Sequence, residues 1–125
     1  MDKKVILVVE DEVSLRSALN DKLNNEGFEV VAAQNGLEGI QEIKKNKPDL
    51  ILLDVVMPIM DGLSMLREIK NDDKTKDIPV VILSNLGDQR DILKAMEHET
   101  FDYLVKSDVT LEAIVAKIKS KLNMT

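Results

Sequence analysis

The sequence predicts an α/β protein in which helices cover both faces of a parallel sheet. Short apolar runs, most of them rich in β-branched residues, alternate with longer stretches whose apolar residues recur at helical spacing. Five such pairs follow one another along the chain, and repeats of this kind build parallel sheets with right-handed crossovers. The expected class is therefore a doubly wound sheet of five strands with five helices.

Five apolar runs are too short for helices and are predicted to be strands. They span residues 5–9, 28–32, 50–53, 80–83 and 103–105. The first, third and fourth are apolar throughout, as strands buried on both faces must be. Polar residues such as Glu29 and Asp102 accompany the second and fifth, which places these two at the edges. This distribution favours a flavodoxin-like sheet of strand order 2-1-3-4-5 over a closed barrel.

Five stretches carry the apolar stripe of an amphipathic helix. The stripes consist of Leu15, Ala18, Leu19 and Leu23; Leu37, Ile40 and Ile43; Leu63, Leu66 and Ile69; Ile92, Leu93 and Met96; and Leu111, Ile114, Val115, Ile118 and Leu122. Gly27 suits a helix C-terminus, and Asn35 with Glu38 suits an N-terminal cap. The sequence shows no linker and no repeat, so we expect residues 1–125 to form a single domain.

Composition excludes several classes of function. The 23 acidic and 17 basic residues give a net charge of −6, which argues against broad binding of nucleic acid or anionic membranes. The absence of cysteine and the single histidine exclude disulfide scaffolds, thiol catalysis and zinc or iron–sulfur sites built from these residues. No apolar run approaches the roughly 18 residues of a membrane span. We therefore expect a cytoplasmic protein whose metal, if it uses one, is a hard cation held by carboxylates.

Polar side chains follow four of the predicted strands at their carboxyl ends, where open parallel sheets bind their ligands. They are Glu10 and Asp11 after the first strand, Asp54 after the third, Ser84 after the fourth and Lys106 after the fifth. Taken singly, Asp11 could be a helix cap, Ser84 a turn residue and Lys106 a solvated charge. Their joint placement favours a functional site with three carboxylates, a hydroxyl and an ammonium at one rim of the sheet.

The chemistry of this cluster points to phosphoryl transfer. Three neighbouring carboxylates repel one another, and a divalent cation relieves that repulsion. With oxygen ligands only, Mg²⁺ is the expected ion. Lys106 and the Ser84 hydroxyl would complete a clamp for phosphoryl oxygens. Asp54, closest to the middle of the sheet, could then act as a nucleophile and become an aspartyl phosphate.

Four segments resemble one known family, the receiver domain of bacterial response regulators, and within it the single-domain chemotaxis regulators. These segments are residues 9–12 (VEDE), 54–62 (DVVMPIMDG), 82–84 (ILS) and 103–106 (YLVK). The second segment is the most specific, because Asp54 precedes Met57-Pro58 by three residues and Met-Asp-Gly follows. The resemblance covers nearly the whole chain, and the family has the 2-1-3-4-5 sheet.

The resemblance implies a role for each site residue. Asp54 would be phosphorylated by the phosphohistidine of a sensor histidine kinase or a phosphotransfer protein, and Lys106 and Ser84 would bind phosphoryl oxygens. Mg²⁺ would be held by Glu10, Asp11, Asp54 and the backbone carbonyl of Val56. Ser84 and Tyr103 would form a switch that alters partner binding on the face made by the fourth helix, fifth strand and fifth helix.

Two other functions fit the residues at the predicted site less well. A Mg²⁺-dependent phosphatase with an aspartyl-phosphate intermediate would resemble the haloacid dehalogenases, which need a second Asp two residues after the nucleophile, where this chain has Val56. A flavin or dinucleotide carrier needs a Gly-rich phosphate loop, whereas residues 9–12 would repel a phosphate without a metal. The sequence therefore favours a signalling module over an enzyme.

Two apolar residues beside the predicted site lead to an expectation about the lifetime of the phosphoryl group. Val56 and Leu86 cannot position an attacking water molecule. We predict slow self-dephosphorylation of the purified phosphoprotein, measured as release of inorganic phosphate. A half-life of seconds would contradict this prediction. The family's usual proline after the lysine is replaced by Ser107, and its small residue after the hydroxyl is replaced by Asn85; both departures bear on rate and not on the identity of the site.

Overall fold

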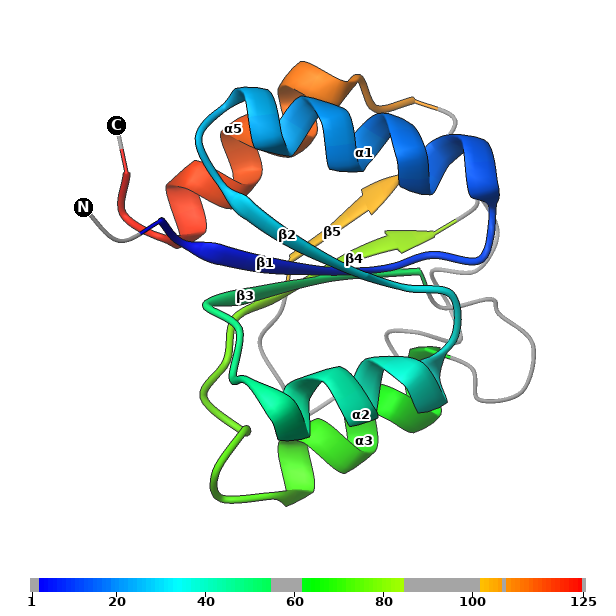
Figure 1. Ribbon diagram of the computed structural model, residues 1–125, viewed down its shortest axis with the longest axis vertical. Coiled ribbons are helices and arrows are strands. Elements are labelled where there is room, and N and C mark those ends of the chain that lie inside the picture. Colours follow the sequence, from blue (N-terminus) through cyan, green and yellow to red (C-terminus); the bar gives the residue numbers. More distant parts are fainter. Residues whose placement is uncertain (1–2, 55–61, 85–101, 107, 125) are drawn as a thin grey trace.

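The computed structural model describes residues 3–54, 62–84, 102–106 and 108–124 (Figure 1). Five strands lie within these ranges: β1 (Val5–Val9), β2 (Glu29–Ala33), β3 (Leu50–Asp54), β4 (Val80–Ser84) and β5 (Asp102–Val105). The helices described are α1 (Val13–Asn25), α2 (Gly36–Lys45), α3 (Gly62–Asn71) and α5 (Leu111–Lys121). The expected fourth helix, with Ile92, Leu93 and Met96, lies outside the described residues. None of the described helices is long and apolar enough to span a membrane.

The strands form one sheet in the order β2-β1-β3-β4-β5, and every neighbouring pair is parallel. The predicted fold class and strand order are therefore confirmed. β1 pairs with β2 on one side and with β3 on the other, so that Leu7 lies between Val31 and Ile51. The exposed Glu29 lies in the edge strand β2, as expected from its polarity.

Helices cover both faces of the sheet, with α1 and α5 on one face and α2 and α3 on the other (Figure 1). Alternate residues of each strand point to opposite faces, because the side-chain period of a strand is two. Ile6 and Val8 of β1 accordingly belong to the apolar cluster beneath α1 and α5, and Leu7 and Val9 to the cluster beneath α2 and α3. The core is thus two apolar layers separated by the sheet.

Two predicted helix ends have the expected geometry. After α1, Gly27 adopts φ 95°, its N–H donates to the Asn24 carbonyl, and the Phe28 N–H donates to the Leu23 carbonyl. This pair of hydrogen bonds defines a Schellman motif, whose left-handed residue is usually glycine. Before α2, the Asn35 side chain accepts a hydrogen bond of 2.9 Å from the Glu38 N–H and so caps the helix.

The predicted apolar stripe of α2 is wrong at Leu37, which is 44% exposed. The buried side of this helix passes instead through Gly36, Gly39 and Ile43. A Cβ atom at Gly39 would lie 2.7 Å from the Met65 side chain, so glycine allows α2 to approach α3 closely. The helix is therefore rotated toward its glycines, and Leu37 faces outward.

An ion pair that joins the edge strand β5 to α5 predicts a pH-dependent contribution to stability. The Lys121 ammonium lies 2.8 Å from Asp102 Oδ2, and that of Lys117 lies 3.6 Å from Oδ1. The hydrogen bond from Lys121 lowers the pKa of the Asp102 carboxyl below its ordinary value, although partial burial opposes this. The stabilisation is therefore present above the ordinary pKa and lost as pH falls through the lowered one.

We expect Asp102→Asn to lower the free energy of unfolding by about 0.5–1 kcal/mol at neutral pH, because the pair is partly exposed. The difference from wild type should shrink in acid near pH 3, where the carboxylate is increasingly protonated. Urea unfolding at both pH values measures it, with the exposed Asp21→Asn of α1 as the matched control. An equal difference at both pH values would contradict the prediction.

Candidate functional site

Three carboxylates meet where the chain leaves β1 and β3. Asp54 is the last residue of β3, and Glu10 directly follows β1, where its N–H donates to the Ala33 carbonyl and extends the ladder toward β2. Glu10 and Asp54 are buried, whereas Asp11 is exposed. One carboxylate oxygen from each of the three residues lies within 4.8 Å of the others. The predicted convergence of these acids is therefore confirmed.

Lys106 reaches the same place from the end of the edge strand β5. It directly follows β5, and its Nζ lies 2.8 Å from Glu10 Oε1 and 3.0 Å from Asp54 Oδ2. Only 16% of its side chain is exposed. Residues 10, 54 and 106 are far apart in sequence, and the parallel order of the sheet brings them into direct contact.

The cluster carries too little positive charge for its acids. With all three carboxylates ionised, the single ammonium would leave two negative charges in excess. Burial raises the pKa of the Glu10 carboxyl to about 7, and the Asp54 charge adds to the rise, although Lys106 and the Glu12 N–H oppose it. Burial disfavours the Lys106 ammonium, but its contacts with Glu10 and Asp54 outweigh this and raise its pKa above the usual value. Lys106 is therefore protonated at neutral pH, and the unbalanced charge is negative.

The donor atoms fit a hard divalent cation. All three side chains offer carboxylate oxygens, which Mg²⁺ prefers. Oxygens that share one Mg²⁺ at about 2.1 Å lie roughly 3–4 Å apart, so oxygens within 4.8 Å of one another need only small movements. Glu10 Oε1 is buried, and no well-aligned hydrogen bond from the described residues reaches it, although the Lys106 charge is close. A cation of charge two would neutralise the excess.

The remaining predicted site residues are placed only in part. Ser84 ends β4 opposite Val105, but its side chain lies outside the described part of the structure, as does Val56. Tyr103 of β5 is half-buried and packs against the apolar cluster beneath α2 and α3. The departures at Asn85 and Ser107, and Leu86, also fall outside the described residues. The roles of Ser84, Val56 and Tyr103 therefore stay predictions.

Arg16 was not among the site residues predicted from the sequence. Its Nη1 donates hydrogen bonds to the backbone carbonyls of Glu10, at 2.8 Å, and Asp11, at 3.4 Å. The sequence signal for this residue was an arginine in the first turns of a helix that directly follows three acidic residues. Helical periodicity alone does not distinguish such a residue from a solvated charge.

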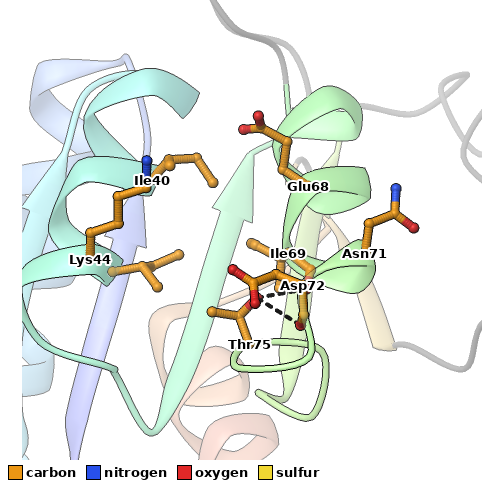
Figure 2. Close-up of a pocket in the computed structure, with 8 residues that line it drawn as sticks. Ile40, Lys44, Glu68, Ile69, Asn71, Asp72 and Thr75 are labelled. Atoms are coloured by element: carbon orange, nitrogen blue, oxygen red, sulfur yellow. Dashed lines mark hydrogen bonds between the residues drawn. The ribbon is translucent and has the colours of Figure 1, made fainter.

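A hollow of about 340 Å³ between α2 and α3 lies apart from this cluster (Figure 2). Its apolar lining comes from Ile40, Ile43 and Ile69, with Lys44 and Glu68 among the polar residues around it. Lys44 and Asn71 belong to the last turns of α2 and α3, at the opposite end of the sheet from the acids. The cavity thus shares no lining residue with the acidic cluster, and the titratable groups, not the hollow, locate the chemistry.

Comparison with known proteins identifies the family. The model of the response regulator receiver domain matches residues 6–119. This chain belongs to the response regulator receiver domain family. It is therefore a receiver domain of two-component signalling, a phosphoacceptor module rather than a classical enzyme.

Individual relatives agree with this assignment. The chain is 39% identical over 113 residues to the chemotaxis protein CheY of Bacillus subtilis, covering 87% of this chain and 92% of that protein. It is 39% identical over 125 residues to the "Probable transcriptional regulator ycf27" of Cyanophora paradoxa, covering 100% of this chain and 51% of the relative. The chain thus spans about half the length of the curated transcriptional regulators it matches.

A solved structure shows the same fold. The phosphorylated cyanobacterial phytochrome response regulator RcpA superimposes with a TM-score of 0.81 at 33% identity, over 95% of this chain and 93% of that one. The family match and the identity to CheY confirm both the expected family and the resemblance to the chemotaxis regulators.

The raised pKa of Glu10 predicts how the metal-free protein responds to pH. A carboxyl whose pKa is higher in the folded state favours folding below its unfolded pKa, near 4.5, and loses that contribution as pH rises through about 7. We expect Glu10→Gln, which mimics the neutral form, to be more stable than wild type near pH 8, by up to about 3 kcal/mol. Near pH 5 the difference should largely disappear.

Urea unfolding in the presence of a chelator measures the difference in stability between Glu10→Gln and wild type at both pH values. Glu29→Gln is the matched control, because Glu29 is an exposed residue of the edge strand β2. If Glu10→Gln were less stable than wild type at both pH values, the Glu10 carboxylate would be a net stabilising partner of Lys106 and the prediction would be wrong.

Proposed function

We propose that this domain accepts a phosphoryl group on Asp54, in a Mg²⁺-dependent reaction, from the phosphohistidine of a sensor histidine kinase or a phosphotransfer protein. The observation that carries the proposal is the position of Asp54. Its carboxylate ends a central, fully buried strand, contacts the Lys106 ammonium at 3.0 Å and lies beside two further acids. A buried carboxylate in this setting is both oriented and close to positive charge.

In the proposed transfer, a carboxylate oxygen of Asp54 attacks phosphorus and forms a new P–O bond. The P–N bond to the donor imidazole breaks, and its electron pair returns to that nitrogen. The histidine leaves neutral because the other ring nitrogen carries a proton, taken up from solvent before the transfer. Lys106, already within hydrogen-bond distance of Asp54, donates to a phosphoryl oxygen. Magnesium, when bound by Glu10, Asp11, Asp54 and the carbonyl of Val56, would neutralise charge on the phosphoryl oxygens and on the acids.

The response to phosphorylation would be a population shift. We infer that the Ser84 hydroxyl binds a phosphoryl oxygen and that Tyr103 then turns inward, which would change partner binding on the face that the expected fourth helix would share with β5 and α5. Support comes from the half-buried position of Tyr103 on an edge strand, where two arrangements need differ by only a few kcal/mol. A downstream effector would recognise the phosphorylated arrangement.

The proposal extends to the organisation of the domain and to where it acts. Residues 1–125 would act as one receiver domain in the cytoplasm, without inserting into a membrane and without binding nucleic acid directly. The net charge of −6 supports the last point. The relative RcpA is a response regulator whose structure is that of a phosphorylated protein, which supports phosphorylation of this domain as well.

Incubation with acetyl phosphate and Mg²⁺, followed by intact-mass measurement, tests the phosphorylation site. Wild type should gain one phosphoryl group, because the small donor requires only the domain's own site. Asp54→Ala should gain none, and a chelator should suppress the gain in wild type. The exposed Asp21→Ala of α1 is the matched control and should behave as wild type. A phosphoryl group on Asp54→Ala would place the reaction elsewhere.

A further inference from the structure

Arg16 lies behind the loop that carries two of the three acids. It is a half-buried residue of α1, and Nη1 donates to the carbonyls of Glu10 and Asp11. Its side chain thus binds the loop through the backbone, whereas the Glu10 carboxylate contacts Lys106. The guanidinium and the ammonium therefore hold different parts of the same segment.

The three acids are not held equally. Glu10 and Asp54 are buried and contact Lys106, so packing and an ion pair fix their carboxylates. Asp11 is exposed, and its carboxylate makes no hydrogen bond or ion pair with the described residues. Its position therefore depends on the backbone that carries it.

That backbone has few restraints. The Glu10 N–H donates to the Ala33 carbonyl, and the Glu12 N–H donates to Glu10 Oε2 at 3.0 Å. Neither bond involves the Glu10 carbonyl or the Asp11 N–H, which form the peptide unit that joins these two residues. Hydrogen bonds from the Arg16 side chain hold the backbone carbonyls of Glu10 and Asp11.

We propose that Arg16 is a positioning residue for the divalent cation: by fixing the carbonyls of Glu10 and Asp11, it holds the exposed Asp11 carboxylate where the cation requires it. This inference rests on the proposed metal site and deepens it. Arginine suits the role because its planar guanidinium presents donors in a fixed arrangement, whereas a lysine ammonium presents rotatable ones. Residues that orient metal ligands typically change metal affinity by about 10–100-fold when they are removed.

The direction in which metal affinity changes when Arg16 is replaced distinguishes positioning from simple electrostatics. A positive charge close to a cation site repels the cation, so charge alone predicts tighter binding when Arg16 is removed. Loss of positioning predicts the opposite. Replacement of Arg16 by an apolar residue of similar length therefore gives different directions for the two explanations.

Binding of Mn²⁺, which shares the preference of Mg²⁺ for oxygen ligands, tests the proposal without any measurement of phosphorylation. The electron paramagnetic resonance signal of free Mn²⁺ gives the affinity for wild type, Arg16→Met, Arg16→Lys and the control Arg67→Met. Arg67 is an exposed residue of α3, so its replacement removes the same charge away from the site. Urea unfolding checks that each variant is folded.

Arg16→Met should bind Mn²⁺ about tenfold more weakly than wild type. Arg16→Lys should lie between the two, and Arg67→Met should match wild type. If Arg16→Met does not fold, weaker binding by Arg16→Lys supports the proposal, and unchanged binding by that variant overturns it. Equal or tighter binding by Arg16→Met overturns it as well, while leaving the metal site intact. Failure of wild type to bind Mn²⁺ would instead overturn the metal site itself, and the role of Arg16 with it.

Discussion

The site depends on an electrostatic constraint: two carboxylates are buried at the end of a parallel sheet with one ammonium between them and a third carboxylate nearby. A buried carboxylate without a partner would be costly, because the low-dielectric interior disfavours its charged form. Lys106 meets this requirement for Glu10 and Asp54 at once, at 2.8 and 3.0 Å. It does not do so completely, because burial still raises the pKa of the Glu10 carboxyl, and the Asp54 charge adds a smaller contribution. The cluster is therefore suited to receive further positive charge.

The sheet explains why these groups meet. Parallel strands present all their carboxyl ends at one edge, and the order β2-β1-β3-β4-β5 makes β1 and β3 neighbours. α1, which follows β1, and α3, which follows β3, lie on opposite faces of the sheet (Figure 1), and open α/β sheets bind their ligands at such a point. The apolar layers on both faces fix the strands, and the strand ends in turn fix the polar residues that follow them.

Much of this was predictable from the sequence, because the signals were local. Uninterrupted apolar runs identified the central strands, and Asp54 and Lys106 were found because each directly follows such a run. The caps at Gly27 and Asn35 were found because helix ends require specific side chains. Leu37 was assigned wrongly because the close contact of Gly39 with Met65, which rotates α2, is a tertiary feature that periodicity does not contain. Arg16 was missed for the same reason, since its partners are backbone carbonyls and not side chains of a recognisable pattern.

The contrast between the buried acids and Asp11 bears on how such a site can exchange its ligands. If all three carboxylates were fixed by the core, the cluster would be rigid, but the cation and the phosphoryl donor would have no accessible ligand to meet first. An exposed carboxylate on a three-residue connection provides that access, but its position is less well fixed. Hydrogen bonds to the backbone restore part of the order without covering the carboxylate, because they act on the carbonyls and leave the side chain free to bind. The β1–α1 connection therefore combines a buried residue, Glu10, whose position the sheet determines, with an exposed one, Asp11, whose position the first turns of α1 determine.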